Sequence, residues 1–244
     1  MNEAGSLVTG RNAVLEALRI GIPARSLLMA EGLRRDPRLQ EITQRCTQAG
    51  VAIRQVERDE LDRRAGHGHQ GVVLLIAPFR YADAGRIVAD ARTKFPRLFV
   101  VTDGVTDPHN FGAIVRSAAA FGAAGVVTRT HRAVGVTPAV WKASAGTVAL
   151  LPVAQVVNIA RFLQELEDFV VVGLAGDAEL DLAHVAGDAA TDPVALVVGA
   201  EGSGLSRLVR EKCTVTARIP MRGGVESLNA AVAVGIALYV LGRR

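Results

Sequence analysis

The chain has 244 residues, half of them hydrophobic, and a formal net charge of +4 that comes from 28 basic and 24 acidic residues. This is the composition of a soluble globular protein with one sizeable core, or with one core and a small second domain. The charge is compatible with nucleic acid or phosphate ligands without deciding for them. The basic residues are 25 Arg and 3 Lys, which suits forked phosphate recognition, although GC-rich coding predicts the same bias.

Three features bear on where the protein works. Cys46 and Cys213 are far apart and form no CxxC pair, so we expect buried thiols in a reducing compartment. The start "MNEAGSLVTG" lacks the basic and apolar regions of a signal peptide. The longest apolar stretch, "LNAAVAVGIALYVLG", is too short to span a membrane. We therefore predict a cytoplasmic protein with no membrane partner.

The first part of the chain alternates between helical and strand patterns. Apolar spacing and turn residues predict, in order, a helix over 10–21, a strand over 24–32, a helix over 37–50, a strand over 51–56, a short helix over 58–65 and a strand over 71–79. These elements predict a small α/β domain over residues 1–78. Residues 79–94 are predicted to be a linker, which leads into a helix.

A second set of alternations follows in residues 95–244. The predicted strands are apolar nearly throughout, as strands buried on both faces of a parallel sheet must be, and they cover 97–104, 125–130, 148–153, 169–176, 194–202 and 215–221. Helices lie between them. The pattern predicts an α/β domain with an open, mainly parallel sheet, whose ligands bind beyond the carboxyl ends of the strands.

The first unusual strand end reads "TDGVTDPHNFGAIVRSA". Asp107 or Asn110 is a candidate cap for the following helix, with Pro108 in its first turn. Capping does not explain Arg116, which lies on the side of the helix that carries small residues. A solvent-facing arginine is the alternative. From Pro108 to Gln164 the chain has no Asp or Glu, so we expect a region of positive potential where a phosphate backbone would bind.

Two more strand ends carry candidate site residues. In "LVVGAEGSGLS" the glycines bring backbone amides close to a ligand, but the spacing is neither a P-loop nor GxGxxG, which argues against an NTPase or a dehydrogenase. Glu201 there suggests a cationic or hydroxyl partner, or is only an acid at a helix start. In "IPMRGGVESLNAAVAVGIALYVL", Ser227 is a candidate cap, and Asn229, within a helix expected to be buried along its length, needs hydrogen-bond partners.

These three stretches, in this order, resemble the three motifs of the SpoU (TrmH-like) family of RNA ribose 2'-O-methyltransferases in the SPOUT superfamily. The matching segments are "DPHNFGAIVRSA", "VVGAEGSGLS" and "IPMRGGVESLNAAVA". Upstream, "GRNAVLEAL" and "HGHQGV" resemble the N-terminal substrate-binding domain of the bacterial 23S rRNA guanosine-2'-O-methyltransferases. The resemblance thus extends over nearly the whole chain.

The resemblance implies a trefoil knot in the C-terminal domain, S-adenosylmethionine as the cofactor, and a homodimer whose interface includes the last helix. By position, the cofactor-binding residues would be Gly199, Ile219, Met221 and Leu228, with Ala175 and Gly176 as neighbours. The catalytic set would be Asn110, Arg116, Glu201, Ser227 and Asn229, all of which are present.

The family is often described with the arginine as the base. An arginine does not readily lose its proton, so we hypothesise that Arg116 binds the phosphate beside the target ribose and stabilises the developing alkoxide, with Glu201 orienting it. The expected RNA-binding residues are Arg11, Asn12, His69, Arg129, Arg132 and Lys142. His67 and His69 form an HxH pair, but with no third ligand nearby we expect no metal.

The resemblance favours a guanosine of 23S rRNA as the target. A tRNA or antibiotic-resistance rRNA 2'-O-methyltransferase shares the motifs and stays an alternative. A non-catalytic RNA-binding protein on the same scaffold is a more remote one.

Overall fold

The computed structural model describes residues 7–34, 36–188, 191–223 and 227–243. The contacts within the chain divide it into two compact units. One ends at Arg80 and also takes in Val136–Lys142, and the other consists of Tyr81–Gly135 and Ala143–Arg244. The second unit therefore starts inside the segment that the sequence predicts as a linker.

The N-terminal unit is a four-stranded sheet in the order β1-β4-β2-β3. Only β2 and β3 are parallel, because the helix α2 connects them; the other pairs are antiparallel. The elements are β1 (Leu7–Thr9), α1 (Arg11–Arg19), β2 (Ala24–Ala30), α2 (Pro37–Gln48), β3 (Ala52–Val56), α3 (Arg58–Ala65) and β4 (Val72–Ile76). The predicted helices and strands are confirmed. The sequence did not predict β1, since three residues carry no readable periodicity.

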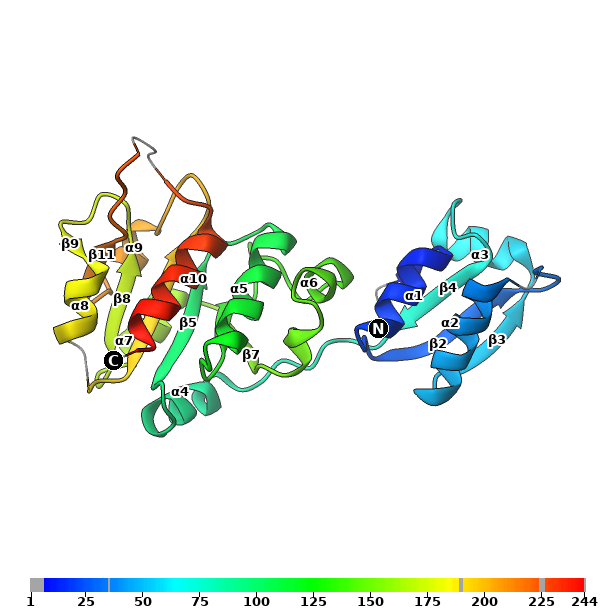
Figure 1. The fold of residues 1–244 in the computed structure, drawn as a ribbon, viewed down its shortest axis with the longest axis horizontal. Helices are drawn as coiled ribbons and strands as arrows, with labels where there is room; N and C mark the ends of the chain where they lie inside the picture. Colours follow the sequence, from blue (N-terminus) through cyan, green and yellow to red (C-terminus); the bar gives the residue numbers. More distant parts are fainter. Residues whose placement is uncertain (1–6, 35, 189–190, 224–226, 244) are drawn as a thin grey trace. The chain divides into compact units, whose positions relative to one another are not determined.

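The second unit contains a seven-stranded sheet in the order β7-β6-β5-β10-β8-β11-β9 (Figure 1). Every neighbouring pair is parallel, which confirms the predicted open parallel sheet. The strands are β5 (Leu98–Asp103), β6 (Val126–Arg129), β7 (Val153–Val156), β8 (Val170–Leu174), β9 (Leu180–Asp181), β10 (Val194–Gly199) and β11 (Val215–Arg218). The trefoil knot stays a prediction.

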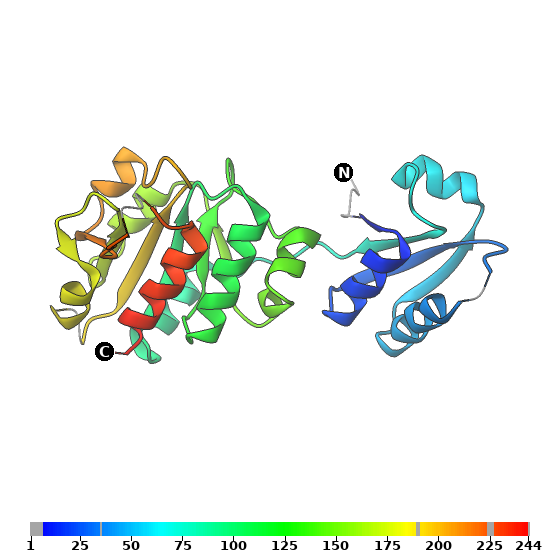
Figure 2. The same cartoon turned by 45° about the horizontal axis from the view of Figure 1, so that its top comes forward.

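Helices cover both faces of this sheet. On one face, α4 (Ala84–Thr93), α7 (Ile159–Gln164) and α9 (Arg207–Arg210) pack on Phe99, Val101 and their neighbours in the central strands. On the other face, α5 (Pro108–Ala120) and α10 (Ala230–Leu241) lie side by side (Figures 1 and 2). α8 (Leu182–Asp188) also belongs to this unit, whereas nearly all of α6 (Pro138–Ala143) belongs to the N-terminal unit. Strands between two helical layers must be apolar on both faces, which is why they read as unbroken apolar runs.

Two expectations about these elements were wrong. The predicted strand over 148–153 is replaced by a 3-10 turn, Thr147–Ala149, followed by β7. The hydroxyl of Thr147 donates to the carbonyl of Ser144, and Pro152 cannot donate to a strand ladder, so the chain turns before pairing. The last helix is not buried along its length, because Val232 and Tyr239 are 52 % and 50 % exposed.

Candidate active site

The start of α5 places the first motif. The Asp107 Oδ2 atom accepts a hydrogen bond from the backbone N–H of Asn110 at 2.9 Å, so Asp107 is the cap among the two candidates. Pro108 occupies the first turn, where a missing N–H costs nothing. The side chain of Asn110 is thereby released from capping. It is 9 % exposed, so its amide group requires polar partners.

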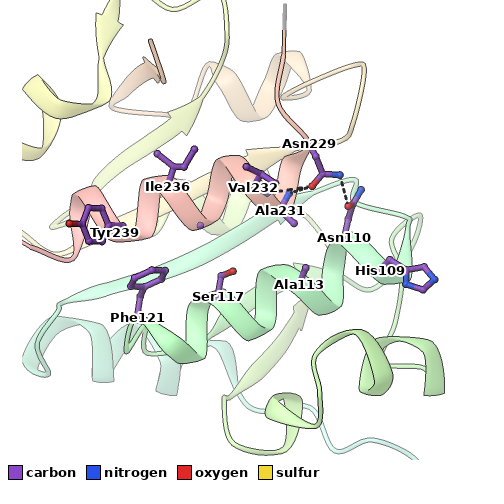
Figure 3. A pocket seen from close by; sticks show the side chains of 11 residues that line it. His109, Asn110, Ala113, Ser117, Phe121, Asn229, Ala231, Val232, Ile236 and Tyr239 are labelled. Carbon is purple, nitrogen blue, oxygen red and sulfur yellow. Dashed lines mark hydrogen bonds between the residues drawn. The ribbon is translucent and has the colours of Figure 1, made fainter. Parts of the chain in front are cut away.

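Asn229 caps α10 and meets Asn110. Its Oδ1 atom accepts the N–H groups of Ala231 at 3.0 Å and Val232 at 3.4 Å. These contacts determine the orientation of the amide, since only the nitrogen is left to donate elsewhere. Nδ2 donates to Asn110 Oδ1 at 2.8 Å (Figure 3). Asn229 therefore precedes the helix instead of lying within it as expected, and the cap role considered for Ser227 belongs to Asn229.

The same chain of hydrogen bonds continues to the second motif. Because Asn110 Oδ1 accepts from Asn229, Asn110 Nδ2 is the group that donates to Glu201 Oε2, at 2.8 Å. Glu201 is an acceptor in this arrangement, which suits an ionised carboxylate. The donor direction thus runs one way, from α10 through α5 to the loop after β10. It joins the three motifs, whose residues lie 119 and 91 positions apart in sequence.

The loop that carries Glu201 is tightly closed. Ala200 N–H donates to the carbonyl of Gly204 at 3.0 Å, and Gly204 N–H returns a bond to the carbonyl of Ala200 at 2.9 Å. A Cβ atom on Gly199 would lie 2.0 Å from the carbonyl carbon of Gly204, far inside van der Waals contact. Gly204 itself has a φ of +66°. The loop therefore needs glycine at both positions for two separate reasons.

Arg116 lies apart from this network. It is exposed on α5, and it makes no ion pair with any residue that the structure describes. We expected Glu201 to orient Arg116; instead, Glu201 accepts from Asn110. The reason is geometric, since six residues along a helix rotate a side chain by about 240° relative to Asn110. Ser227 is also exposed, and residues 224–226 of the third motif lie outside the described residues.

The expected cofactor residues lie at the carboxyl ends of three adjacent strands. Gly199 ends β10, Ala175 and Gly176 follow β8, and Ile219 follows β11. The N–H of Ala175 donates to the carbonyl of Ala217 at 3.1 Å, which holds the ends of β8 and β11 together. Met221 and Leu228, the other two expected residues, are each 37 % exposed. Small residues beside exposed apolar side chains fit an adenosine group with an aliphatic chain.

The basic residues of the acid-free stretch differ in availability. Arg129 Nη2 lies 2.6 Å from Asp103 Oδ1, whose side chain is 2 % exposed, so Arg129 is engaged in an internal ion pair, and the RNA contact expected there stays a prediction. Lys142 Nζ lies 3.0 Å from Glu16 within the N-terminal unit. Arg132 is exposed, has a φ of +56° and pairs with no described residue. Acids from outside the stretch therefore neutralise part of its charge, which sequence distance alone conceals.

His69 is buried rather than available to RNA. Its side chain is 1 % exposed, Nδ1 accepts the N–H of Gly71 at 2.9 Å, and Nε2 lies 3.1 Å from Asp62 Oδ1. Since Nδ1 accepts, Nε2 carries the proton of the neutral ring and donates to Asp62. His67 contacts the same oxygen at 3.1 Å. Hydrogen bonds from His69 and His67 keep the pKa of Asp62 below its usual value.

This loop also holds the first residues of α1. Arg11 N–H donates to Gln70 Oε1 and Arg11 Nε to the Gln70 carbonyl, both at 3.1 Å, and its Nη1 pairs with Asp36. Asn12 is exposed and lines a polar pocket between α1 and α2, beside Arg38. Of the predicted N-terminal RNA contacts, the structure therefore leaves Asn12 available, engages Arg11 and buries His69.

An apolar groove runs along α5 and α10 (Figure 3). Val232, Ile236 and Tyr239 form its α10 side, and Phe121 packs edge-on against Tyr239 with ring centroids 6.2 Å apart. The family resemblance implied that this helix is part of a dimer interface, but the sequence did not show which of its residues are exposed, because α10 is apolar all round and has no periodic contrast. No helix among the described residues is long and apolar enough to cross a membrane.

Two protein-family models match this chain. Residues 97–239 match the model of the SpoU rRNA Methylase family, and residues 7–82 match the model described as RNA 2'-O ribose methyltransferase substrate binding. An uncharacterized tRNA/rRNA methyltransferase of Mycolicibacterium vanbaalenii is 45 % identical over 242 residues, which cover 98 % of this chain and 76 % of that protein. One from Mycobacterium leprae is 45 % identical over 240 residues, or 97 % and 77 % of the two chains.

Solved structures similar to this chain are also methyltransferases. The SpoU methyltransferase AviRb from Streptomyces viridochromogenes, in complex with S-adenosylmethionine, has a TM-score of 0.72 and 30 % identity, over 98 % of this chain and 90 % of that one. An S-adenosylmethionine-bound rRNA methyltransferase from Sinorhizobium meliloti has a TM-score of 0.66 and 26 % identity, over 97 % and 86 % of the two chains. The chain therefore belongs to the SpoU rRNA methylase family and is an S-adenosylmethionine-dependent RNA methyltransferase.

Proposed function

We propose that this enzyme methylates the ribose 2'-hydroxyl of a guanosine in 23S rRNA. The observation that carries the choice of a ribose hydroxyl is the hydrogen-bonded chain Asn229–Asn110–Glu201, which ends on a carboxylate whose second oxygen accepts no hydrogen bond from the described residues. The match of residues 7–82 to the family model for RNA 2'-O ribose methyltransferase substrate binding also supports the ribose 2'-hydroxyl as the methylated group. The guanosine of 23S rRNA rests on the "GRNAVLEAL" and "HGHQGV" segments.

The five motif residues divide the work of the reaction. S-adenosylmethionine supplies, when bound, an electrophilic methyl group on a positively charged sulfur. Arg116 binds the phosphate next to the target ribose and, as a forked, permanently charged donor, stabilises the 2'-oxygen while that phosphate or a water molecule accepts the hydroxyl proton. Asn110 and Asn229 hold Glu201 in a single orientation, so that the carboxylate needs no reorganisation when RNA binds. Ser227, exposed ahead of α10, contacts the ribose.

The cofactor would be held by backbone and apolar groups at the ends of β8, β10 and β11. We assign Gly199, Ala175 and Gly176 to close backbone contact, because each lacks a side chain beyond Cβ. Ile219, Met221 and Leu228 would pack on the adenine. Their partial exposure is consistent with surface that a ligand covers.

RNA contacts outside the catalytic centre would come from exposed groups in each unit. In the N-terminal unit Asn12 and Arg38 line the polar pocket, and Arg11 pairs with Asp36, which also lines it. His69 is buried and would support the loop rather than contact RNA directly. In the other unit Arg132 is the predicted cation that lacks an internal partner among the described residues. We expect phosphate contacts there, which would make binding depend on salt.

We also propose a homodimer that buries the groove between α5 and α10. Exposed Val232, Ile236 and Tyr239 on one helix are typical of an interface core rather than of scattered surface residues. Replacing Ile236 with Glu would place a charge in the middle of this stripe. We expect the variant to elute as a monomer in size-exclusion chromatography with light scattering; an unchanged mass would refute this interface.

The target is tested by mapping 2'-O-methyl groups in the RNA of a strain that lacks the gene. We expect one 23S rRNA guanosine to lose its methyl group and to regain it when the wild-type gene is returned, but not with the Arg116→Ala form. Loss of a methyl group from a tRNA instead would refute the rRNA assignment. A solved structure described as acting in 2-OH methylation of C/U34 on tRNA matches 60 % of this chain at a TM-score of 0.54 and 28 % identity, so the tRNA fraction must be mapped in parallel.

A further inference from the structure

Asp103 is a buried carboxylate that the motif residues do not include. It ends β5, and its side chain is 2 % exposed. Oδ1 lies 2.6 Å from Arg129 Nη2 at the end of β6, and Oδ2 accepts the backbone N–H of Ser206 at 2.8 Å. A buried carboxylate is tolerated only when it is paired and hydrogen-bonded, and removing one partner leaves an uncompensated charge. Both oxygens of Asp103 are therefore committed.

Asp103 is tied to both ends of the Glu201 loop. Gly199, where the loop begins, is aligned with Asp103 in the parallel ladder between β10 and β5. Ser206, where the loop ends, donates to the Asp103 side chain. Between them, Ala200 and Gly204 exchange two backbone hydrogen bonds. One residue of β5 thus anchors both ends of the segment that presents Glu201.

Arg129 supplies the charge that makes this anchor possible. The register that aligns Val101 with Val127 brings the ends of β5 and β6 together, two residues further on. Arg129 is 28 % exposed, and its Nε is buried with no hydrogen-bond partner among the described residues. Its Nη2 contact with Asp103 is therefore the polar interaction that the structure assigns to it. This separates Arg129 from Arg116 and Arg132, which are exposed.

We propose that Asp103 is a positioning residue that holds the Glu201 loop in its closed form, and that Arg129 compensates the buried charge of Asp103. The inference rests on the proposed function in one respect, because it takes Glu201 as part of the reacting site. Its consequence is that loosening Asp103 displaces the Glu201 carboxylate. Neither Asp103 nor Arg129 needs to touch the RNA or the cofactor.

A first experiment measures the loop directly by amide hydrogen exchange in the full-length chain. Asp103→Asn keeps an oxygen for Ser206 but removes the charge; we expect exchange of the amides in 200–206 to rise by roughly tenfold or more, as loss of a charged hydrogen bond predicts. Asp168→Asn is the matched control, because Asp168 pairs with Arg92 at the surface at 2.7 and 2.8 Å. Wild-type protection of the loop in Asp103→Asn would overturn the proposal.

A second experiment tests whether Asp103 acts through Glu201. Methyl transfer from S-adenosylmethionine to total RNA of the deletion strain is measured for Asp103→Asn, Glu201→Gln and the double variant. We expect Asp103→Asn to lower kcat about tenfold when Glu201 is present and by less than about threefold in the Glu201→Gln background, since coupled residues are not additive. Equal losses in the two backgrounds would overturn the proposal.

Arg129 keeps the proposal testable if Asp103→Asn does not fold. Arg129→Lys retains a cation and is expected to keep kcat and loop protection within about threefold of wild type, whereas Arg129→Gln should lose roughly tenfold in both. Equal behaviour of the two variants would overturn the role of the charge. A wild-type protein that methylates none of this RNA would refute the proposed function alone, because the exchange measurement still decides the role of Asp103.

Discussion

The substitution Asn110→Asp tests the hydrogen-bonded chain with a nearly isosteric change. The Oδ1 atom that accepts from Asn229 at 2.8 Å is kept, but the group that donates to Glu201 at 2.8 Å becomes a second carboxylate oxygen. The variant therefore exchanges a charge-assisted hydrogen bond for a like-charge contact. The rest of α5, including its Asp107 cap, is untouched.

The magnitude follows from these contacts. A hydrogen bond to a charged group contributes about 1.5 to 3 kcal/mol. Two carboxylate charges about 3 Å apart repel each other by roughly 1.5 kcal/mol in a water-like environment, which is appropriate because Glu201 is exposed. Together these effects amount to about 3 to 4.5 kcal/mol, or a loss of roughly 10²- to 10³-fold in kcat/KM if the orientation of Glu201 is required in the transition state.

The assay is methyl transfer to total RNA of the deletion strain at neutral pH. Asn158→Asp is the control, since Asn158 caps α7 through its side-chain oxygen, away from the three motifs. We expect the control to stay within about threefold of wild type because an acid is tolerated at a helix start.

Two results would refute the reasoning. Wild-type kcat/KM for Asn110→Asp at neutral pH would mean that the transition state does not need the contact between Asn110 and Glu201. An equal loss in Asn158→Asp would mean that the assay reports on general stability. Circular dichroism and the thermal midpoint of each variant distinguish these cases from unfolding.

Three further predictions concern other parts of the molecule. Arg116→Ala should lower kcat roughly 10²- to 10³-fold while S-adenosylmethionine affinity by calorimetry stays within about threefold, because Arg116 acts on the RNA side; a large loss of affinity would contradict this. Gly199→Ala should abolish S-adenosylmethionine binding, since its Cβ would lie 2.0 Å from the Gly204 carbonyl carbon, and measurable wild-type affinity would contradict the closed loop. Hydrogen bonds from Arg19 and Arg45 lower the pKa of Glu41 from 4.5 to about 2. Ionised Glu41 therefore stabilises the fold above pH 4.5, and this contribution is lost as the pH falls toward 2. The thermal midpoint of Glu41→Gln should accordingly fall less steeply than that of wild type over this range, and parallel curves would refute the assignment.

Much of the site could be predicted because its residues are locally anomalous. Glu201 follows an apolar strand, and Asn110 and Asn229 lie at the start of mainly apolar helices, where polar side chains stand out. Their residue types and spacing are enough to indicate the SpoU family without the three-dimensional structure. The parallel sheet was equally readable, since strands such as Leu98–Asp103 and Val194–Gly199 are buried on both faces and are therefore apolar over most of their length.

The partners of these residues could not be predicted in the same way. The sequence predicted RNA contacts at Arg129 and His69. In the structure Arg129 pairs with Asp103, and the buried His69 donates to Asp62. The exposed stripe of α10 was hidden for the opposite reason, because a helix that is apolar all round gives no sign of which face is covered.

The sequence by itself determined the fold class, the family and the identity of the polar groups at the strand ends, because apolar periodicity and motif spacing are local properties of the chain. Only the tertiary structure decided which of those groups meet. The order β5-β10 in the sheet brings the loops of Asn110 and Glu201 together, and the packing of α10 on α5 brings in Asn229. Such contacts join residues about a hundred positions apart, and they depend on strand order and burial, which no local pattern encodes.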